Sequence, residues 1–218
     1  MAHVLVIGSS QGIGKAVAEQ LALRGHSVRA FSRKIHQDIF RNSSIETIRG
    51  NALESDDVAA ALDGVDTVVQ ALGVKANLRM ITGPVTLFSE ATKVLLQAMQ
   101  ATDVRRLIAV TGFGAGDCAA AISPLQRIPF RAVLGQAYDD KTIQEQLISG
   151  SELDWMIVRP GVLTNARCGG GYQVLVQPDT WQNGVVTRGD VADYIASEVA
   201  KETLGKIKPV VIRYPFPL

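Results

Sequence analysis

The residues best suited to chemistry in this sequence begin near its N-terminus, in a glycine-rich loop. The loop reads Gly8-Ser9-Ser10-Gln11-Gly12-Ile13-Gly14. Gly8 permits a tight turn, Gly12 lets backbone approach a bound anion without a Cβ, and Gly14 allows close contact between a helix and a strand. Free N–H groups and the positive end of a helix dipole would then face a phosphate. The pattern predicts a diphosphate-binding turn, the alternative being a glycine turn that binds no nucleotide.

The segments around this loop alternate between apolar runs and amphipathic stretches. Strands are expected at 4–7, 28–31, 45–48, 67–69, 107–111, 155–158, 172–176 and 210–212, and helices at 13–21, 56–62, 85–101, 139–149 and 190–201. Strands separated by helices of about ten or more residues pair in parallel through right-handed crossovers. The predicted fold class is α/β, a single Rossmann-type doubly wound, mostly parallel sheet flanked by helices.

Composition supports one folded domain. The chain has 218 residues, of which 47% are hydrophobic and 20% charged, and this excludes a disordered chain. At this size a folded monomer buries roughly 70% of the surface that its unfolded chain exposes. We expect one domain over residues 1–218, with a small substrate-side region from about 112–138 and 162–188.

Charge and cysteine usage exclude several classes of partner. The 22 Lys+Arg nearly cancel the 21 Asp+Glu, so no electrostatic footprint for nucleic acid or membrane is present. Cys118 and Cys168 are far apart and the three histidines lie in the first sixth of the chain, so neither a disulfide framework nor a metal site is expected. No uncharged apolar stretch reaches the ~18 residues of a membrane span, and no basic-then-apolar leader opens the chain. These features predict a cytoplasmic protein. A monomer or a homodimer is expected, and the sequence does not choose between them.

The glycine loop resembles that of the short-chain dehydrogenase/reductase superfamily, and the resemblance covers most of the chain. In that superfamily the residues that end the second strand select the cofactor: an acidic side chain binds a ribose 2′-hydroxyl, and a basic one neutralises a 2′-phosphate. This sequence has Ser32-Arg33-Lys34 there, with no acidic residue before Asp38. The resemblance implies NADP(H) in preference to NAD(H). The alternative is that Arg33 and Lys34 are solvated loop charges.

Three further segments resemble cofactor-lining parts of the superfamily. Gly50-Asn51-Ala52 resembles a turn, usually Gly-Asp, whose polar side chain meets the adenine amino group. Ala71-Leu72-Gly73 resembles the small-residue turn beneath the adenosine ribose. The Pro-Gly segment beside the nicotinamide is matched by Pro160-Gly161-Val162. Pro160 also has a purely structural interpretation, because a proline ends a strand by lacking an N–H.

The main branch of the superfamily carries Tyr-x-x-x-Lys on one helix and a Ser at the end of the preceding strand, and the Lys lowers the pKa of the proton-transferring Tyr. Here Tyr138 stands three residues before Lys141, with Ala137 at the usual tyrosine position, and Thr111 ends the strand. Residues three apart share a helix face. We expect helix 139–149 to leave Tyr138 just outside it, because Asp139 and Asp140 suit a first turn. Tyr138 is therefore interpreted either as a catalytic residue or as a residue that packs in the core or lines the binding site.

A longer pattern resembles the atypical, NmrA-like and biliverdin/flavin reductase-like members. It consists of Lys141-x-x-x-Glu145, then Ser151-Glu152-Leu153-Asp154-Trp155, then Val158-Arg159-Pro160-Gly161. This resemblance implies that Lys141 contacts the nicotinamide ribose, the alternative being a surface ion pair with Glu145. Thr187-Arg188-Gly189-Asp190-Val191-Ala192 resembles the family's entry to a late helix, in which Asp190 is an N-cap or first-turn residue that offsets unpaired N–H groups.

These resemblances imply an NADP(H)-dependent oxidoreductase that transfers hydride to a small planar or carbonyl-bearing acceptor, such as a flavin or quinone. Thr111, Tyr138 and Lys141 are its candidate catalytic residues. Solvent can protonate a flavin or tetrapyrrole after hydride arrives, so the protein contributes orientation and a dry pocket. The segment 112–138 is apolar enough to line that pocket, and equally to form a lid or a dimer contact, and its Cys118 is interpreted as a small packing residue.

Two other functions stay open. The missing tyrosine at position 137 favours an NmrA-like sensor that binds NADP without turnover. Nucleotide-sugar epimerase chemistry is less favoured, because about 58 residues follow Pro160 and leave little room for a substrate domain.

Overall fold

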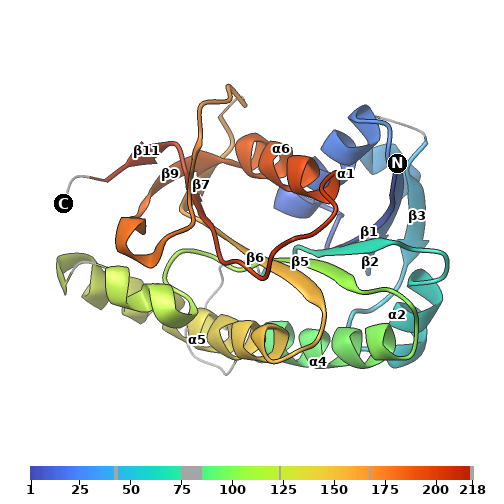
Figure 1. Ribbon diagram of the computed structural model, residues 1–218, viewed down its shortest axis with the longest axis horizontal. Helices are drawn as coiled ribbons and strands as arrows, with labels where there is room; N and C mark the ends of the chain where they lie inside the picture. The colour runs from blue at the N-terminus through green and yellow to red at the C-terminus, as the bar shows by residue number, and fades with distance from the viewer. Residues whose placement is uncertain (42–43, 75–84, 123, 167, 217–218) are drawn as a thin grey trace.

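The computed structural model has three layers, a twisted sheet between two sets of helices (Figure 1). It describes residues 1–41, 44–74, 85–122, 124–166 and 168–216, and it describes 124–133 by their backbone alone. Among the described residues no helix is long and apolar enough to cross a membrane.

The main sheet, over the described residues, has eight strands in the order β3-β2-β1-β4-β5-β6-β10-β8. Its strands are β1 (His3–Ile7), β2 (Ser27–Ser32), β3 (Glu46–Arg49), β4 (Thr67–Gln70), β5 (Arg106–Val110), β6 (Asp154–Pro160), β8 (Gln173–Leu175) and β10 (Val210–Ile212). All neighbours pair in parallel except β8, which is antiparallel to β10. The strand order reverses at β1, between β2 and β4, and ligands of such sheets bind outside the carboxyl ends of the strands at this switch point. The predicted fold class is confirmed.

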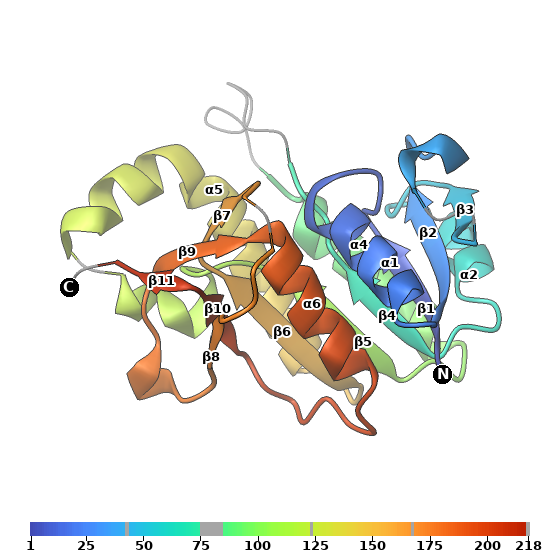
Figure 2. The same ribbon diagram turned by 90° about the horizontal axis from the view of Figure 1, so that it is seen from above.

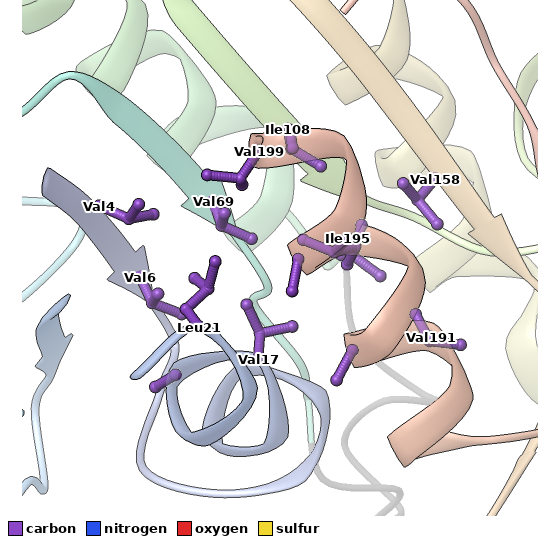
Figure 3. Packing of buried hydrophobic residues seen from close by; sticks show 14 of the residues in the cluster. Val4, Val6, Val17, Leu21, Val69, Ile108, Val158, Val191, Ile195 and Val199 are labelled. Carbon is purple, nitrogen blue, oxygen red and sulfur yellow. The ribbon is translucent and has the colours of Figure 1, made fainter. Parts of the chain in front are cut away.

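Helices cover both faces of the sheet. One face carries α1 (Gly12–Leu23) and α6 (Arg188–Val199), and the other α2 (Ser55–Ala61), α4 (Leu87–Gln100) and α5 (Pro124–Ser149) (Figures 1 and 2). The β1 residues from Val4 to Ile7 are all buried, as expected for a strand covered on both faces. Figure 3 shows the core under α1 and α6, where Val17 and Leu21 of α1 and Ile195 of α6 pack against Val6 and Val69 of the sheet. This packing holds both helices against the same face of the sheet.

A second, small sheet lies beside the main one. It has the order β11-β9-β7, from β7 (Val162–Thr164), β9 (Gly184–Thr187) and β11 (Tyr214–Pro215). These strands have two to four residues, which is too short for a period-2 pattern to be visible, and the sequence did not predict them. The short 3₁₀ helices at Gln37–Ile39, Gly116–Ala121 and Pro178–Thr180 were missed as well.

One expected boundary is wrong. The helix predicted at 139–149 begins at Pro124, so most of the segment 112–138 is helical and not an irregular loop. A proline at the first helical position needs no N–H partner within the helix, which suits Pro124 to begin α5. Asp139 and Asp140 consequently lie well inside α5, not in its first turn.

Candidate functional site

The glycine loop forms a tight turn at the switch point of the sheet. Gly8 and Gly12 have φ of +89° and +62°, in the left-handed region that favours glycine. A Cβ on Gly8 would lie 2.6 Å from the carbonyl oxygen of Ala71, and a Cβ on Gly14 would collide with the carbonyl oxygen of Gly8. The three glycines are therefore required by the geometry of the turn.

The start of α1 is left open for an anion. Gln11 precedes the helix and makes no side-chain capping bond, and the first turn contains no acidic residue. The buried Ser9 is directed inward, with its hydroxyl donating to the Phe31 carbonyl at 3.3 Å, and Ile13 packs on the core. Ser10 is half-buried and Gln11 exposed. The N–H groups of the first turn, which have no partner within the helix, can donate hydrogen bonds to a phosphate, and the positive end of the helix dipole also favours an anion there.

The end of β2 presents more positive charge than the sequence predicted. Ser32 is half-buried, and Arg33 and Lys34 are exposed immediately after it. Arg49, the last residue of β3, lies in register with Ser32, and its Nε donates to the carbonyl oxygen of Arg33 at 3.2 Å. The parallel pairing of β2 and β3 thus adds a third cation, which no motif around position 49 signals.

The adenine-side candidates lie on the turns that follow β3 and β4. The Asn51 amide is engaged locally: its Oδ1 accepts from Leu53 N at 3.3 Å, and its Nδ2 donates to Glu54 at 3.4 Å. An adenine contact would therefore use the second lone pair of Oδ1. Ala52 is buried in the core under α2. After β4, Ala71 and Leu72 are half-buried and Gly73 is exposed.

Thr111, Tyr138 and Lys141 come together at the carboxyl end of β5. The Lys141 ammonium donates to the carbonyl oxygen of Thr111, and it lies 5.6 Å from the ring centroid of Tyr138. A Cβ on Gly112 would lie 2.5 Å from the Tyr138 hydroxyl oxygen, so this glycine makes room for the tyrosine. The expectation that Tyr138 lies outside the helix is wrong, because α5 begins fourteen residues earlier.

The pKa values of Tyr138 and Lys141 differ from those expected of a catalytic Tyr–Lys pair, in which the lysine lowers the pKa of the tyrosine. Burial lowers the pKa of Lys141 to about 8, against the opposing charges of Glu145 and Asp140. Burial also raises the pKa of Tyr138 to about 12. The phenol is therefore held protonated at neutral pH, in a site that does not activate it as a base.

A buried ionic cluster lies directly behind Thr111. The Thr111 hydroxyl donates to Glu145 Oε1 at 2.7 Å, and Arg159 Nε donates to the same oxygen at 3.0 Å. Arg159 Nη2 bonds both Glu145 Oε2 and Asp117, and the guanidinium stacks on Trp181 with 4.8 Å to the ring centroid. Glu145 is 1% exposed and Arg159 0%, so the alternative of a surface Lys141–Glu145 pair is wrong.

Asp140 joins two helices. Its carboxylate accepts from the backbone N–H of Phe88 at 2.7 Å and of Ser89 at 3.3 Å, in the first turn of α4. A carboxylate at a helix N-terminus satisfies its open N–H groups and complements the dipole. Lys141 lies over the Phe88 ring, 4.8 Å from its centroid. The hydrogen bonds from α4 to Asp140 hold α5 against α4, and they thereby help to position the neighbouring Lys141.

The Pro160-Gly161-Val162 segment connects β6 to the small sheet. The Pro160 carbonyl accepts from Phe113 N at 2.8 Å, and Gly161 N donates to Val211 O at 3.1 Å. A Cβ on Gly161 would collide with the carbonyl oxygen of Gly184. Val162 is half exposed at the start of β7. Pro160 therefore does end a strand, beside the end of β5 where Thr111 lies.

A family model described as NAD(P)H-binding matches residues 8–202, from the glycine loop to the end of α6. The chain belongs to this NAD(P)H-binding family. The match confirms the resemblance to an NAD(P)-binding family that the glycine loop and the later motifs indicated.

Curated relatives are distant and span much of the chain. A chloroplastic protein of Arabidopsis thaliana, itself uncharacterised, is 27% identical over 98% of this chain and 78% of its own length. Protein TIC 62, chloroplastic, from Oryza sativa subsp. japonica is 26% identical, and the match covers 88% of this chain but only 42% of that protein. This chain thus spans less than half of the length of TIC 62.

Solved structures share the fold along the whole chain. ChuY of Escherichia coli O157:H7, described as an anaerobilin reductase, superposes with a TM-score of 0.82 at 23% identity, covering 99% of both chains. A short-chain dehydrogenase/reductase of Veillonella parvula in complex with NADP gives 0.77 at 14% identity, covering 99% of this chain and 98% of that one. At such identities the likeness to these structures establishes the fold of this chain alone.

Proposed function

We propose that the protein is an NADP(H)-dependent reductase that transfers hydride to a small planar acceptor such as a flavin or quinone. The observation that carries the proposal is the position of Lys141, whose ammonium is held at the carboxyl end of β5 by the Thr111 carbonyl. Bound there, a reduced nicotinamide supplies the hydride. Lys141 would hold the nicotinamide ribose, and the turn before α1 the diphosphate. Pro160, Gly161 and Val162 would border the ring.

The preference for NADP(H) over NAD(H) is part of the proposal. It is supported by Arg33, Lys34 and Arg49 at the ends of β2 and β3, where a 2′-phosphate would lie. A guanidinium binds phosphate through two parallel N–H groups, and neighbouring cations add attraction. No acidic side chain lies between Arg33 and Asp38 to bind a ribose 2′-hydroxyl.

The hydrogen bond of Thr111 and the raised pKa of Tyr138 favour a planar acceptor over a carbonyl. The Thr111 hydroxyl already donates its one hydrogen bond to Glu145. It can therefore accept a further hydrogen bond but cannot donate one to a developing alkoxide. The Tyr138 phenol, with its pKa raised to about 12, is a poor acid. An acceptor protonated by solvent does not need either group.

Following NADPH absorbance with separate flavin, quinone and aldehyde panels tests the proposal. Acceptor-dependent oxidation with flavin or quinone, and little with aldehydes, is the expected result. Lys141→Met should raise the Kd for NADPH without unfolding the protein. If aldehydes are reduced efficiently and flavins and quinones are not, the choice of acceptor is wrong.

The sensor alternative has one observation in its favour, which is the absence of tyrosine at position 137. Tight NADPH binding without oxidation by any panel would support a sensor and exclude turnover. Epimerase chemistry has no comparable support in the arrangement of the site.

A further inference from the structure

Arg188 begins α6 directly beside the glycine loop. Thr187 caps this helix by accepting from Asp190 N at 3.0 Å, so Asp190 lies in the first turn, one of the two positions expected for it, and is not the N-cap. Because α1 and α6 lie side by side (Figures 2 and 3), their N-termini come close together. A Cβ built on Gly12 would lie 4.0 Å from Arg188 Nε, the nearest side-chain atom to that position. A cation from α6 therefore lies over the turn that opens α1.

A neighbouring loop holds the Arg188 side chain in place. Its Nη1 donates to Asn165 Oδ1 at 2.7 Å, just after β7. Arg188 is half-buried, and its Nε and Nη2 have no hydrogen-bond partner among the described residues. The guanidinium is thus oriented by one bond and keeps two donor positions available.

The carboxylates near Arg188 are already engaged elsewhere. Asp190 Oδ1 accepts from Gly170 N at 3.1 Å, and its Oδ2 accepts from Thr187 and lies 3.8 Å from Arg213. Asp193, one turn further along α6, pairs with Arg24 at the far end of α1. Within the described part of the chain, no carboxylate balances the charge of Arg188.

We propose that Arg188 is a second anchor for the diphosphate bridge of the dinucleotide, reaching from α6 to the phosphates that the glycine loop binds from α1. The inference rests on the proposed function and adds a residue to the same site. A half-buried guanidinium with free donors next to unpaired N–H groups matches the charge and the oxygen geometry of a diphosphate. The diphosphate is common to NADPH and NADH, so this contact binds both equally.

Arg188→Ala tests the proposal by fluorescence titration with NADPH and NADH. Loss of a charge-assisted contact should raise Kd roughly 10-fold or more for both dinucleotides and leave their affinity ratio unchanged. Arg33→Ala, by contrast, should change the ratio of the NADPH and NADH affinities. Binding of ADP-ribose, which contains the diphosphate, should weaken in Arg188→Ala, whereas binding of adenosine 2′-monophosphate, which lacks it, should not.

Two further variants serve as controls. Arg188→Lys keeps the charge and should recover part of the affinity, and Arg24→Ala removes a cation from the same helix pair at the far end of α1 and should leave Kd unchanged. A Kd for Arg188→Ala within twofold of wild type, or an unchanged ADP-ribose affinity with a raised KM for the acceptor, would overturn the assignment. If the wild type itself binds neither dinucleotide, the proposed function has failed instead.

Discussion

The hydroxyl of Thr111 and the carboxylate of Glu145 are joined by a 2.7 Å hydrogen bond, across 34 positions of sequence. Glu145 is in turn bonded to Arg159, so the end of β5, the C-terminal part of α5 and the end of β6 form one buried unit. This unit sets the position of Lys141 one turn earlier on α5. We interpret it as the rigid support of the nicotinamide side of the site.

Breaking this unit should cost more stability than breaking a surface pair. Glu145→Gln leaves the buried Arg159 guanidinium without its main counter-charge, and one-sided disruption of a buried pair typically costs about 3–5 kcal/mol. Glu90→Gln is the matched control, because Glu90 pairs with Lys93 at the surface with both side chains about half exposed. Its expected cost is at most about 1 kcal/mol. Urea unfolding at neutral pH measures both, and equal losses would refute the structural role of the unit.

The glycine loop should tolerate no added methyl group at Gly14. A Cβ there collides with backbone, so Gly14→Ala must displace the turn from α1, and we expect NADPH binding to fall below detection. Gly150→Ala is the control, since its nearest neighbour would be Gln146 O at 3.4 Å, an ordinary contact. Calorimetric titration of both variants with NADPH, with a thermal melt to verify folding, decides the matter. Normal binding by Gly14→Ala would contradict the geometry of the turn.

Tyr138 should contribute little to the rate with a planar acceptor. Its phenol has a pKa raised to about 12 by burial, so Tyr138→Phe is expected to keep the turnover rate within a few-fold of wild type. A true proton donor would instead be worth at least ~10²-fold. Tyr214→Phe, at an exposed position of the small sheet, controls for loss of a phenol elsewhere. Steady-state rates with flavin or quinone give the answer.

Lys141 should make folding stability depend on pH in the alkaline range. Its pKa falls from 10.5 in the unfolded chain to about 8 in the folded protein, so between these values the unfolded state binds more protons. Stability from this residue therefore rises as the pH increases from about 8 to 10.5. The free energy of unfolding of wild type relative to Lys141→Met should increase over that window. A flat or falling difference would show that the ammonium is not desolvated.

The parts of the site predicted from sequence are those built by contiguous residues. The glycine loop and the Arg33-Lys34 pair are local patterns, and a turn between a strand and a helix needs no distant partner to take shape. Arg49 gains its role from strand pairing, and nothing adjacent in sequence signals it. Glu145 and Arg159 belong to a recognisable sequence pattern, but their hydrogen bonds to each other depend on α5 packing on the sheet, which that pattern does not give.

The start of α5 was missed for a different reason. Asp139 and Asp140 resemble first-turn residues, and the segment before them carries no clear helical periodicity, yet the helix begins at Pro124, where a helix tolerates proline. Tyr138 therefore lies inside α5 and not just before it, and it shares a helix face with Lys141, whose Nζ lies 5.6 Å from its ring centroid.

The central claim is that the turn before α1 binds a dinucleotide whose 2′-phosphate meets the cations at the ends of β2 and β3. Calorimetric titration of the wild type and of Arg33→Ala with NADPH and NADH tests it most directly. We predict that the wild type binds NADPH at least ~10-fold more tightly than NADH and that Arg33→Ala loses most of this difference. Absence of binding to either dinucleotide, or an affinity ratio that Arg33→Ala leaves unchanged, would contradict the claim.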